Sequence, residues 1–171
     1  MPTKAKPLPP LSVLREHFSY DPETGIVKRI KANKYRPNNL GVCGQLLKGR
    51  LVVRFNGTRL YIHRLAWKLQ TGLEPPDEID HKNRNPVDNK WSNLRACTSK
   101  QNSANCKQRS SQYPRGVRKV RHRFYAKGLR GGYATPEEAH AAYRTWHLNR
   151  YGEFSVFAPS SSELLELRSD G

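Results

Sequence analysis

The segment LVVRFNGTRLYIH, residues 51–63, constrains the fold most because it specifies a β-hairpin with a defined register. The Asn-Gly pair at positions 56–57 is a favoured two-residue hairpin turn. Around this turn the apolar residues fall on one face of the hairpin, and Arg54 and Arg59 fall on the reverse face. The pattern predicts an antiparallel sheet with one buried side, whose other side can meet phosphates.

Hydrophobic residues make up only 36% of the 171 residues, so the chain can build small cores but not one large core. Apolar periodicity and capping signals predict short helices and short strands in alternation. A short helix followed by a turn is predicted within residues 11–25, and further helices are predicted at residues 63–72, 98–108 and 134–152. The predicted strands include 78–83, 93–98 and a series within 116–133. These elements predict the α+β class.

Charge is the strongest compositional signal. The 31 Lys and Arg residues outnumber the 14 Asp and Glu residues, which gives a net charge of +17 and favours a polyanionic partner. Residues 63–112 carry nine basic and five acidic side chains and are the least basic part of the body of the chain. Acidic residues inside a cationic protein suggest a site that holds a cation against a phosphate. A soluble basic protein and an RNA-binding protein are the alternatives.

The polar segment IDHKNRNPVDNKWSNLR, residues 79–95, brings an Asp, a His and several Asn together and has the composition of a catalytic site. Asp80 and His81 end a predicted strand, and Asn102 lies one turn into the following helix. The Asp80 carboxylate and the Asn102 amide oxygen could share one magnesium or manganese ion, while His81 could accept a proton from water. The loop that carries Asn93 could orient the turn or the imidazole. The alternative is a polar surface loop whose Asn residues only shape turns.

The pieces HRLAW, IDH, DNKWSNLR and QNSAN occur in an order that resembles phage-type HNH homing endonucleases over roughly residues 50–110. The resemblance implies a ββα-metal site that hydrolyses a phosphodiester bond in double-stranded DNA. It implies that Asp80 and Asn102 bind a divalent metal ion, that His81 is the general base, and that Asn93 supports the loop. With one motif per chain, we expect a monomer that nicks one strand.

Residues 113–154 have a separate resemblance. The pieces GVRKV, FYAKG, GGYATPEEAHAAY and YGEF are similar to the Apetala-type DNA-binding domain of plant ethylene-response factors. That family places three strands in the DNA major groove with a helix packed behind them. The candidate DNA-binding residues here are Arg115, Arg118, Lys119, Arg121, Arg123, Lys127 and Arg130. A solvated basic sheet without groove contact is the alternative.

The predicted organisation is an N-terminal antiparallel sheet, a ββα-metal HNH core, and a small C-terminal three-stranded sheet packed on one helix. The predicted regions are 1–50 (DNA-contacting), 51–106 (nuclease core with its preceding hairpin), 107–112 (linker), 113–158 (Apetala-like module) and 159–171 (flexible tail). Outside the motif, Arg64 is a candidate phosphate contact, and His63 could be a packed imidazole or could support the site. Asp88 and Asn89 are expected to shape the loop, with metal binding as the alternative. His17, His122, His140 and His147 show no partner pattern.

Three cysteines without a CxxC pair predict reduced thiols and argue against a structural zinc site. No apolar run approaches membrane-spanning length, and no secretory signal is recognisable. The charge and the two resemblances predict double-stranded DNA as the partner. We expect no membrane association, no obligate protein partner, and a location in a bacterial or phage-infected cytoplasm. The rival function is a DNA-binding regulator without nuclease activity.

Overall fold

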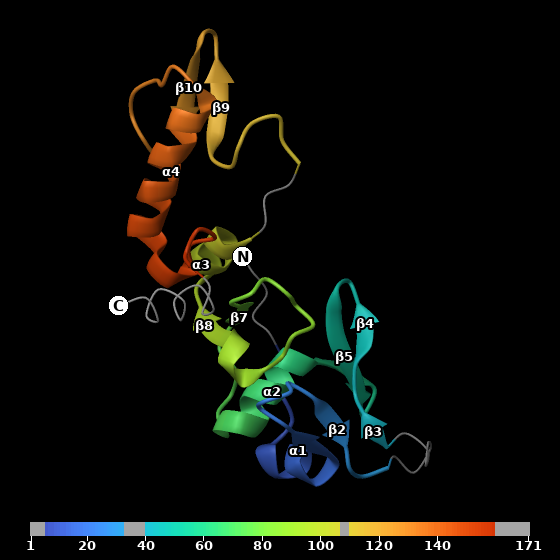
Figure 1. The fold of residues 1–171 in the computed structure, drawn as a ribbon. Helices are drawn as coiled ribbons and strands as arrows, with labels where there is room; N and C mark the ends of the chain where they lie inside the picture. Colours follow the sequence, from blue (N-terminus) through green and yellow to red (C-terminus); the bar gives the residue numbers. More distant parts are fainter. Residues whose placement is uncertain (1–5, 33–39, 107–109, 160–171) are drawn as a thin grey trace, which may run out of the picture. The chain divides into compact units, whose positions relative to one another are not determined.

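A computed structural model of the chain describes residues 6–32, 40–106 and 110–159. The chain divides into two compact units, residues 1–99 and 100–171, which are treated separately (Figure 1). The elements in chain order are α1 (Leu11–His17), β1 (Phe18–Tyr20), β2 (Val27–Arg29), β3 (Gly41–Val42), β4 (Gln45–Leu47), β5 (Arg50–Phe55), β6 (Thr58–Tyr61), α2 (Ile62–Thr71), β7 (Glu78–His81), the 3-10 helix η1 (Trp91–Asn93), β8 (Leu94–Cys97), α3 (Ser99–Asn105), β9 (Val117–Val120), β10 (Arg123–Ala126), α4 (Pro136–Tyr151) and the 3-10 helix η2 (Gly152–Phe154). The predicted α+β class is confirmed.

Small antiparallel sheets form the framework of the first unit. Strands β1, β2 and β3 form one sheet, and β4, β5 and β6 form another, each in that order. The β5–β6 register places Arg54 opposite Arg59, as the sequence predicts. Asn56 and Gly57 both have positive φ values, of 46° and 76°, because a tight hairpin turn of this hand requires left-handed backbone at both positions.

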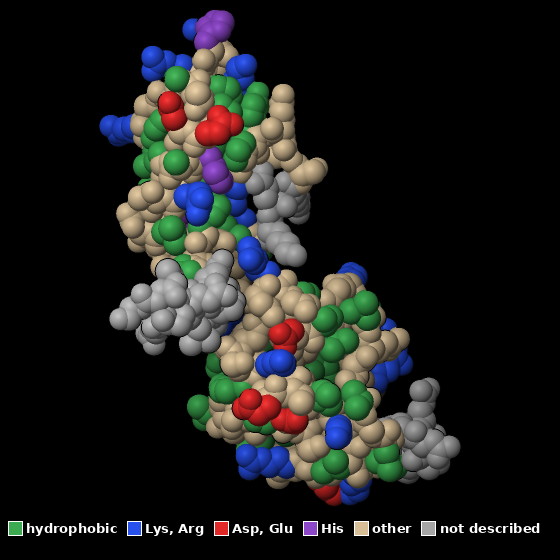
Figure 2. All heavy atoms as spheres, in the orientation of Figure 1, with side chains coloured by type: hydrophobic (Ala, Val, Ile, Leu, Met, Phe, Trp, Pro, Cys, Tyr) green, Lys and Arg blue, Asp and Glu red, His purple; other side chains and the backbone are tan. Residues whose placement is uncertain are grey.

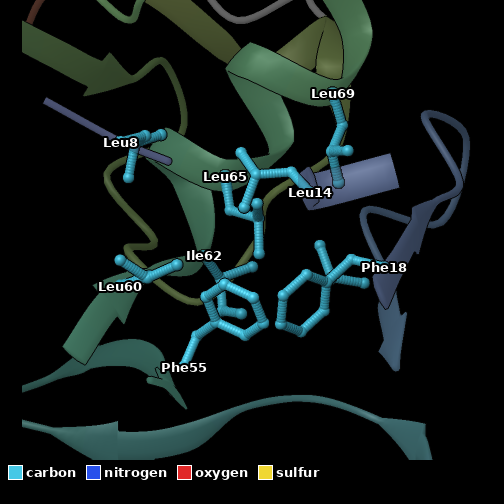
Figure 3. Close-up of a cluster of buried hydrophobic side chains, with 9 residues drawn as sticks. Leu8, Leu14, Phe18, Phe55, Leu60, Ile62, Leu65 and Leu69 are labelled. Carbon is cyan, nitrogen blue, oxygen red and sulfur yellow. The ribbon is translucent and has the colours of Figure 1, made fainter. Parts of the chain in front are cut away.

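The main core of the first unit lies between α1, α2 and the β5–β6 hairpin (Figure 3). Leu14 and Leu65 are fully buried there, and the Phe18 and Phe55 rings meet edge to face at 5.4 Å between centroids. The hairpin departs from the predicted single buried side, because Val52 on the face of Arg54 is also buried. Arg54 and Arg59 on the same face are nevertheless exposed.

A second, smaller cluster joins α2 to the β7–β8 hairpin. The sequence predicted all three elements, and Gly72 in left-handed conformation ends α2 as expected. Ile79 of β7 and Leu94 of β8 pack against Ala66 of α2. The cluster fixes one face of the β7–β8 hairpin to the helix, which determines where the side chains of Asp80 and His81 point.

In the second unit, β9 and β10 form an antiparallel hairpin and α4 packs on both strands. The Thr135 hydroxyl caps α4 by accepting the Glu138 N–H at 3.2 Å, as predicted, and Ala139 and Tyr143 are buried. The predicted third strand is reduced to a single bridge between Phe124 and Tyr133. Helix α4 begins only three residues after Tyr133, which leaves too little chain for a full strand.

His147 has a structural role that the sequence did not indicate. Its side chain is 2% exposed, and Nδ1 lies 2.7 Å from the Ser155 hydroxyl. His140 likewise has a partner, the Arg115 carbonyl, at 3.0 Å. Among the described residues, no helix has both the length and the apolar character needed to cross a membrane.

Candidate active site

The β7–β8 hairpin sorts the motif residues onto two faces. In its register Asp80 lies opposite Arg95, and His81 lies opposite Leu94. Because successive residues of a strand point to opposite sides, Asp80 and Arg95 share one face, and His81 shares the other face with Ile79. That second face packs on α2, so His81 points towards the helix and Asp80 points away from it.

His81 is held by two neighbours within the first unit. Its Nε2 lies 3.3 Å from the Asn89 side-chain oxygen, and its ring meets the His63 ring edge to face at 5.5 Å. An amide oxygen can only accept a hydrogen bond, so Nε2 donates and the lone pair of the neutral ring lies on Nδ1. This tautomer makes Nδ1 the basic nitrogen.

The environment of His81 also keeps the imidazole neutral. The residue is only 4% exposed, and this burial lowers the pKa of His81 below its usual value; the hydrogen bond that Nε2 donates to Asn89 offsets part of the lowering. The positive charge of Arg50 lowers the pKa further. A general base must be unprotonated before the reaction, and this environment meets that requirement at neutral pH. His81 is therefore much less exposed than the imidazole of a histidine on a solvent-facing loop would be.

Asp80 is neutralised by a residue that the sequence did not single out. Arg95 donates from Nε and Nη2 to the same carboxylate oxygen, Oδ2, at 2.9 and 2.7 Å. The Asp80 side chain is buried at 6% exposure, and the Arg95 side chain is largely covered at 10% exposure. The signal that could have identified Arg95 is the hairpin register, because it is the cross-strand partner of Asp80.

Asn93 makes the contacts expected of a residue that supports the loop. Its side-chain oxygen accepts the Asn83 N–H at 2.9 Å, and its side-chain nitrogen donates to the Asp88 carbonyl at 2.7 Å. Its own carbonyl accepts the Lys82 N–H at 2.9 Å. Asn93 is 8% exposed, so these bonds replace water and fix both ends of the loop between β7 and β8.

Residues near the N-terminal sheet hold the backbone of the loop at Asn89. The Tyr20 hydroxyl donates to the Asn89 carbonyl at 2.8 Å. Gly25, at a φ of +74°, lies so close to Asn89 and Lys90 that a Cβ would come within 2.4 Å of the Lys90 nitrogen. The sequence predicted that Asn89 shapes the loop, with metal binding as the alternative; the structure adds that its side chain holds His81.

His63 is buried at 7% exposure, and its Nδ1 is the one buried side-chain polar atom without a hydrogen-bond partner among the described residues. Burial lowers the pKa of His63 to about 3, and the positive charge of Arg50 is the second cause of the lowering. His63 is therefore a neutral, packed imidazole between Tyr61 and His81. This matches the packed alternative predicted for it.

The proposed metal ligands lie in different units. Asp80 belongs to the first unit, whereas Asn102, half-buried in α3, belongs to the second. Joint ligation of one ion by these two side chains therefore stays a prediction. Within the described residues no group of three or more His, Cys, Asp and Glu side chains could hold a metal ion. The buried Asp80 carboxylate does fit a cation, since it already requires a positive charge beside it.

The candidate DNA-binding residues differ in accessibility. Arg54 and Arg59 are exposed, whereas Arg64 is 9% exposed and donates to the Pro76 carbonyl at 3.2 Å. We therefore assign Arg64 to the packing of α2 against the connection that follows it. Arg115 is half-buried and donates to carbonyls at the end of α3.

The β9–β10 hairpin carries the other basic candidates. Arg118 lies over the Tyr125 ring and Lys119 over the Phe124 ring, so aromatic side chains hold these two cations in place. Arg123 donates to the Gly132 carbonyl at 3.2 Å. The exposed basic candidates of this unit are Arg118, Lys119, Arg121, Arg123, Lys127 and Arg130. Figure 2 shows Lys and Arg side chains, in blue, spread over the visible face of each unit.

Residues 60–104 match a family model described as HNH endonuclease. The match begins in β6 and includes α2 and both strands of the hairpin that carries Asp80 and His81. It supports a nuclease that acts on DNA. Neither the curated proteins nor the solved structures that were searched gave a match.

Proposed function

We propose that this chain is a metal-dependent HNH endonuclease of the homing type that hydrolyses a phosphodiester bond in double-stranded DNA and nicks one strand as a monomer. The observation that carries the proposal is the neutral His81 imidazole, held through Nε2 by Asn89 within the segment that matches the HNH endonuclease model. This arrangement is the one that a base acting on water requires.

The roles follow from the contacts. His81 removes a proton from the attacking water through Nδ1, and Asn89 and His63 hold its ring in orientation. Asn93 keeps the loop in the shape that presents Asn89. Asp80 and Asn102 would hold a magnesium or manganese ion through hard oxygen donors. When bound, such an ion stabilises the negative charge on the scissile phosphate and on the leaving 3′ oxygen.

The basic side chains would supply DNA affinity. Arg54 and Arg59 form an exposed pair on the β5–β6 hairpin, and the second unit offers the exposed hairpin cations. We propose that the second unit is an Apetala-type module that binds the major groove through β9 and β10. Contacts of Arg and Lys with phosphates would position the chain on DNA, and contacts with base edges would give sequence preference.

A DNA-binding regulator without nuclease activity is the second candidate. One observation favours it: Asp80 already has Arg95 as its counter-ion, and both Asp80 and His81 are almost fully buried. In this alternative the hairpin is a structural element, and the basic surfaces carry the whole function.

The test is nicking of supercoiled plasmids that carry random genomic inserts, with magnesium or manganese present. The wild type should nick in a metal-dependent way. At equal DNA occupancy, His81→Ala should nick more slowly by a factor of at least about 100. His122→Ala is the matched control, because His122 is exposed and lies outside the first unit. Binding without metal-dependent nicking by the wild type would favour the regulator, and undiminished nicking by His81→Ala would remove His81 as the base.

A further inference from the structure

We propose that Arg95 is a resident counter-ion of Asp80 that competes with the divalent metal ion. In the absence of metal its guanidinium supplies the positive charge that the buried carboxylate needs, and so it lowers the affinity of the protein for metal. This inference rests on the proposed function, because it assumes that Asp80 is a metal ligand.

The geometry of the pair is that of a strong interaction. Asp80 and Arg95 are direct cross-strand partners, and two nitrogens of one guanidinium converge on the single oxygen Oδ2. The exposed Lys31–Glu16 pair of the same unit leaves more than half of each side chain in solvent. Solvent weakens such surface pairs, whereas a buried pair is strongly coupled, so removing one partner leaves an uncompensated charge.

The charges on this face explain how Arg95 acts on metal binding. Glu78 shares the face with Asp80, so two carboxylates and one guanidinium face the same side of the hairpin. Arg95 thus halves the negative charge that would attract a divalent ion, and it also occupies a carboxylate oxygen. Asn102 would add a neutral donor only. A metal ion must therefore overcome both a repulsion and a hydrogen-bonded competitor.

DNA can relieve this competition. A phosphate that approaches Arg95 offers the guanidinium another acceptor of matching geometry and adds negative charge at the metal position. Metal binding would then be tighter in the presence of DNA than in its absence, and by reciprocity the metal would tighten DNA binding. Such coupling would keep the reactive centre without metal until the substrate is bound.

The experiment measures manganese binding to the full-length, DNA-free protein by the electron paramagnetic resonance signal of free Mn²⁺. Arg95→Gln should bind Mn²⁺ at least about tenfold more tightly than the wild type, because a nearby positive charge and a competitor are removed. Mn²⁺ should also raise the melting temperature of Arg95→Gln more than that of the wild type. Arg15→Gln is the matched control: it removes the same charge from an exposed site and should bind Mn²⁺ like the wild type.

Asp80→Asn separates the two proposals. Suppose that Asp80→Asn abolishes a Mn²⁺ site in the wild type, while Arg95→Gln binds Mn²⁺ as weakly as the wild type or more weakly. The inference about Arg95 is then overturned and the metal-dependent function stands. If no variant has a Mn²⁺ site that depends on Asp80, the proposed metal dependence fails, and the inference fails with it.

Arg95→Lys covers the case in which Arg95→Gln does not fold, since lysine keeps the charge but cannot direct two nitrogens in a fixed planar geometry at one oxygen. It should bind Mn²⁺ with an affinity between those of the wild type and an unopposed Asp80. If Arg95→Lys bound Mn²⁺ with the same affinity as the wild type, the proposed competition between Arg95 and the metal ion would be overturned.

Discussion

His63 shows how a single buried side chain makes stability depend on pH. In the folded chain the pKa of His63 is about 3, whereas an unfolded histidine has a pKa of about 6.5. Below pH 6.5 the unfolded state therefore binds a proton that the folded state does not, and this favours unfolding. The stability that neutral His63 permits is fully present above pH 6.5 and is lost as the pH falls from 6.5 towards 3.

We predict that the first unit loses about 2 kcal/mol of stability between pH 7 and pH 5 through His63, and that His63→Gln removes this loss. His81 contributes in the same direction, because burial lowers its pKa too. Urea unfolding followed by the fluorescence of the packed Trp67 and Trp91 rings measures the change. His122→Gln, on the exposed β9–β10 turn, is the control, and an unchanged pH dependence in His63→Gln would contradict the prediction.

At the same scale, the sequence identified the motif residues but not all their partners. Asp80, His81 and Asn93 could be found because acid, imidazole and amide occur in order along one short segment. Arg95 was not singled out, and the contact of Asn89 with His81 was not predicted, because these contacts depend on strand register and on loop shape. The burial of Arg64 also escaped prediction, since a charged residue in an amphipathic helix gives no sign of the carbonyl that receives it.

Among the elements, hairpins with strong turn chemistry were predicted best. The Asn-Gly turn and the alternation around it set the β5–β6 register correctly, because a shift by one residue would turn every apolar side chain to the other face. The third strand of the second unit failed because a strand needs length as well as composition, and the helix start at Pro136 ends it early.

The β5–β6 hairpin also carries two opposed positive charges that an anionic partner such as DNA would stabilise. Arg54 and Arg59 are directly opposite, and like charges in such positions destabilise a sheet. We predict that the double variant Arg54→Ala, Arg59→Ala weakens duplex DNA binding by roughly tenfold without lowering the melting temperature.

Fluorescence anisotropy with a labelled duplex measures this binding. The control is Arg15→Ala, Lys28→Ala, which removes the same charge from exposed positions on α1 and β2. Equal weakening by both double variants would show that net charge matters and that the hairpin face has no special role.

For the whole molecule, charge is the property that acts over the longest range. The basic residues are distributed over both units and are not confined to the segment that matches the nuclease model. If about six phosphates are contacted, the affinity for duplex DNA should fall about 1,000-fold between 50 and 200 mM salt. The same anisotropy titration at several salt concentrations checks this, and a nearly flat plot of log affinity against log salt would exclude extensive phosphate contact.

The close approach of Gly25 to the loop between β7 and β8 limits how small a working fragment can be. The segment that matches the nuclease model begins at residue 60, yet the loop that presents Asn89 to His81 rests on Tyr20 and Gly25, far upstream. A graft of residues 60–104 into another scaffold would carry the proposed general base and metal ligands. It would lack Tyr20 and Gly25, against which the loop packs. Any transplant of this site should therefore begin before β1.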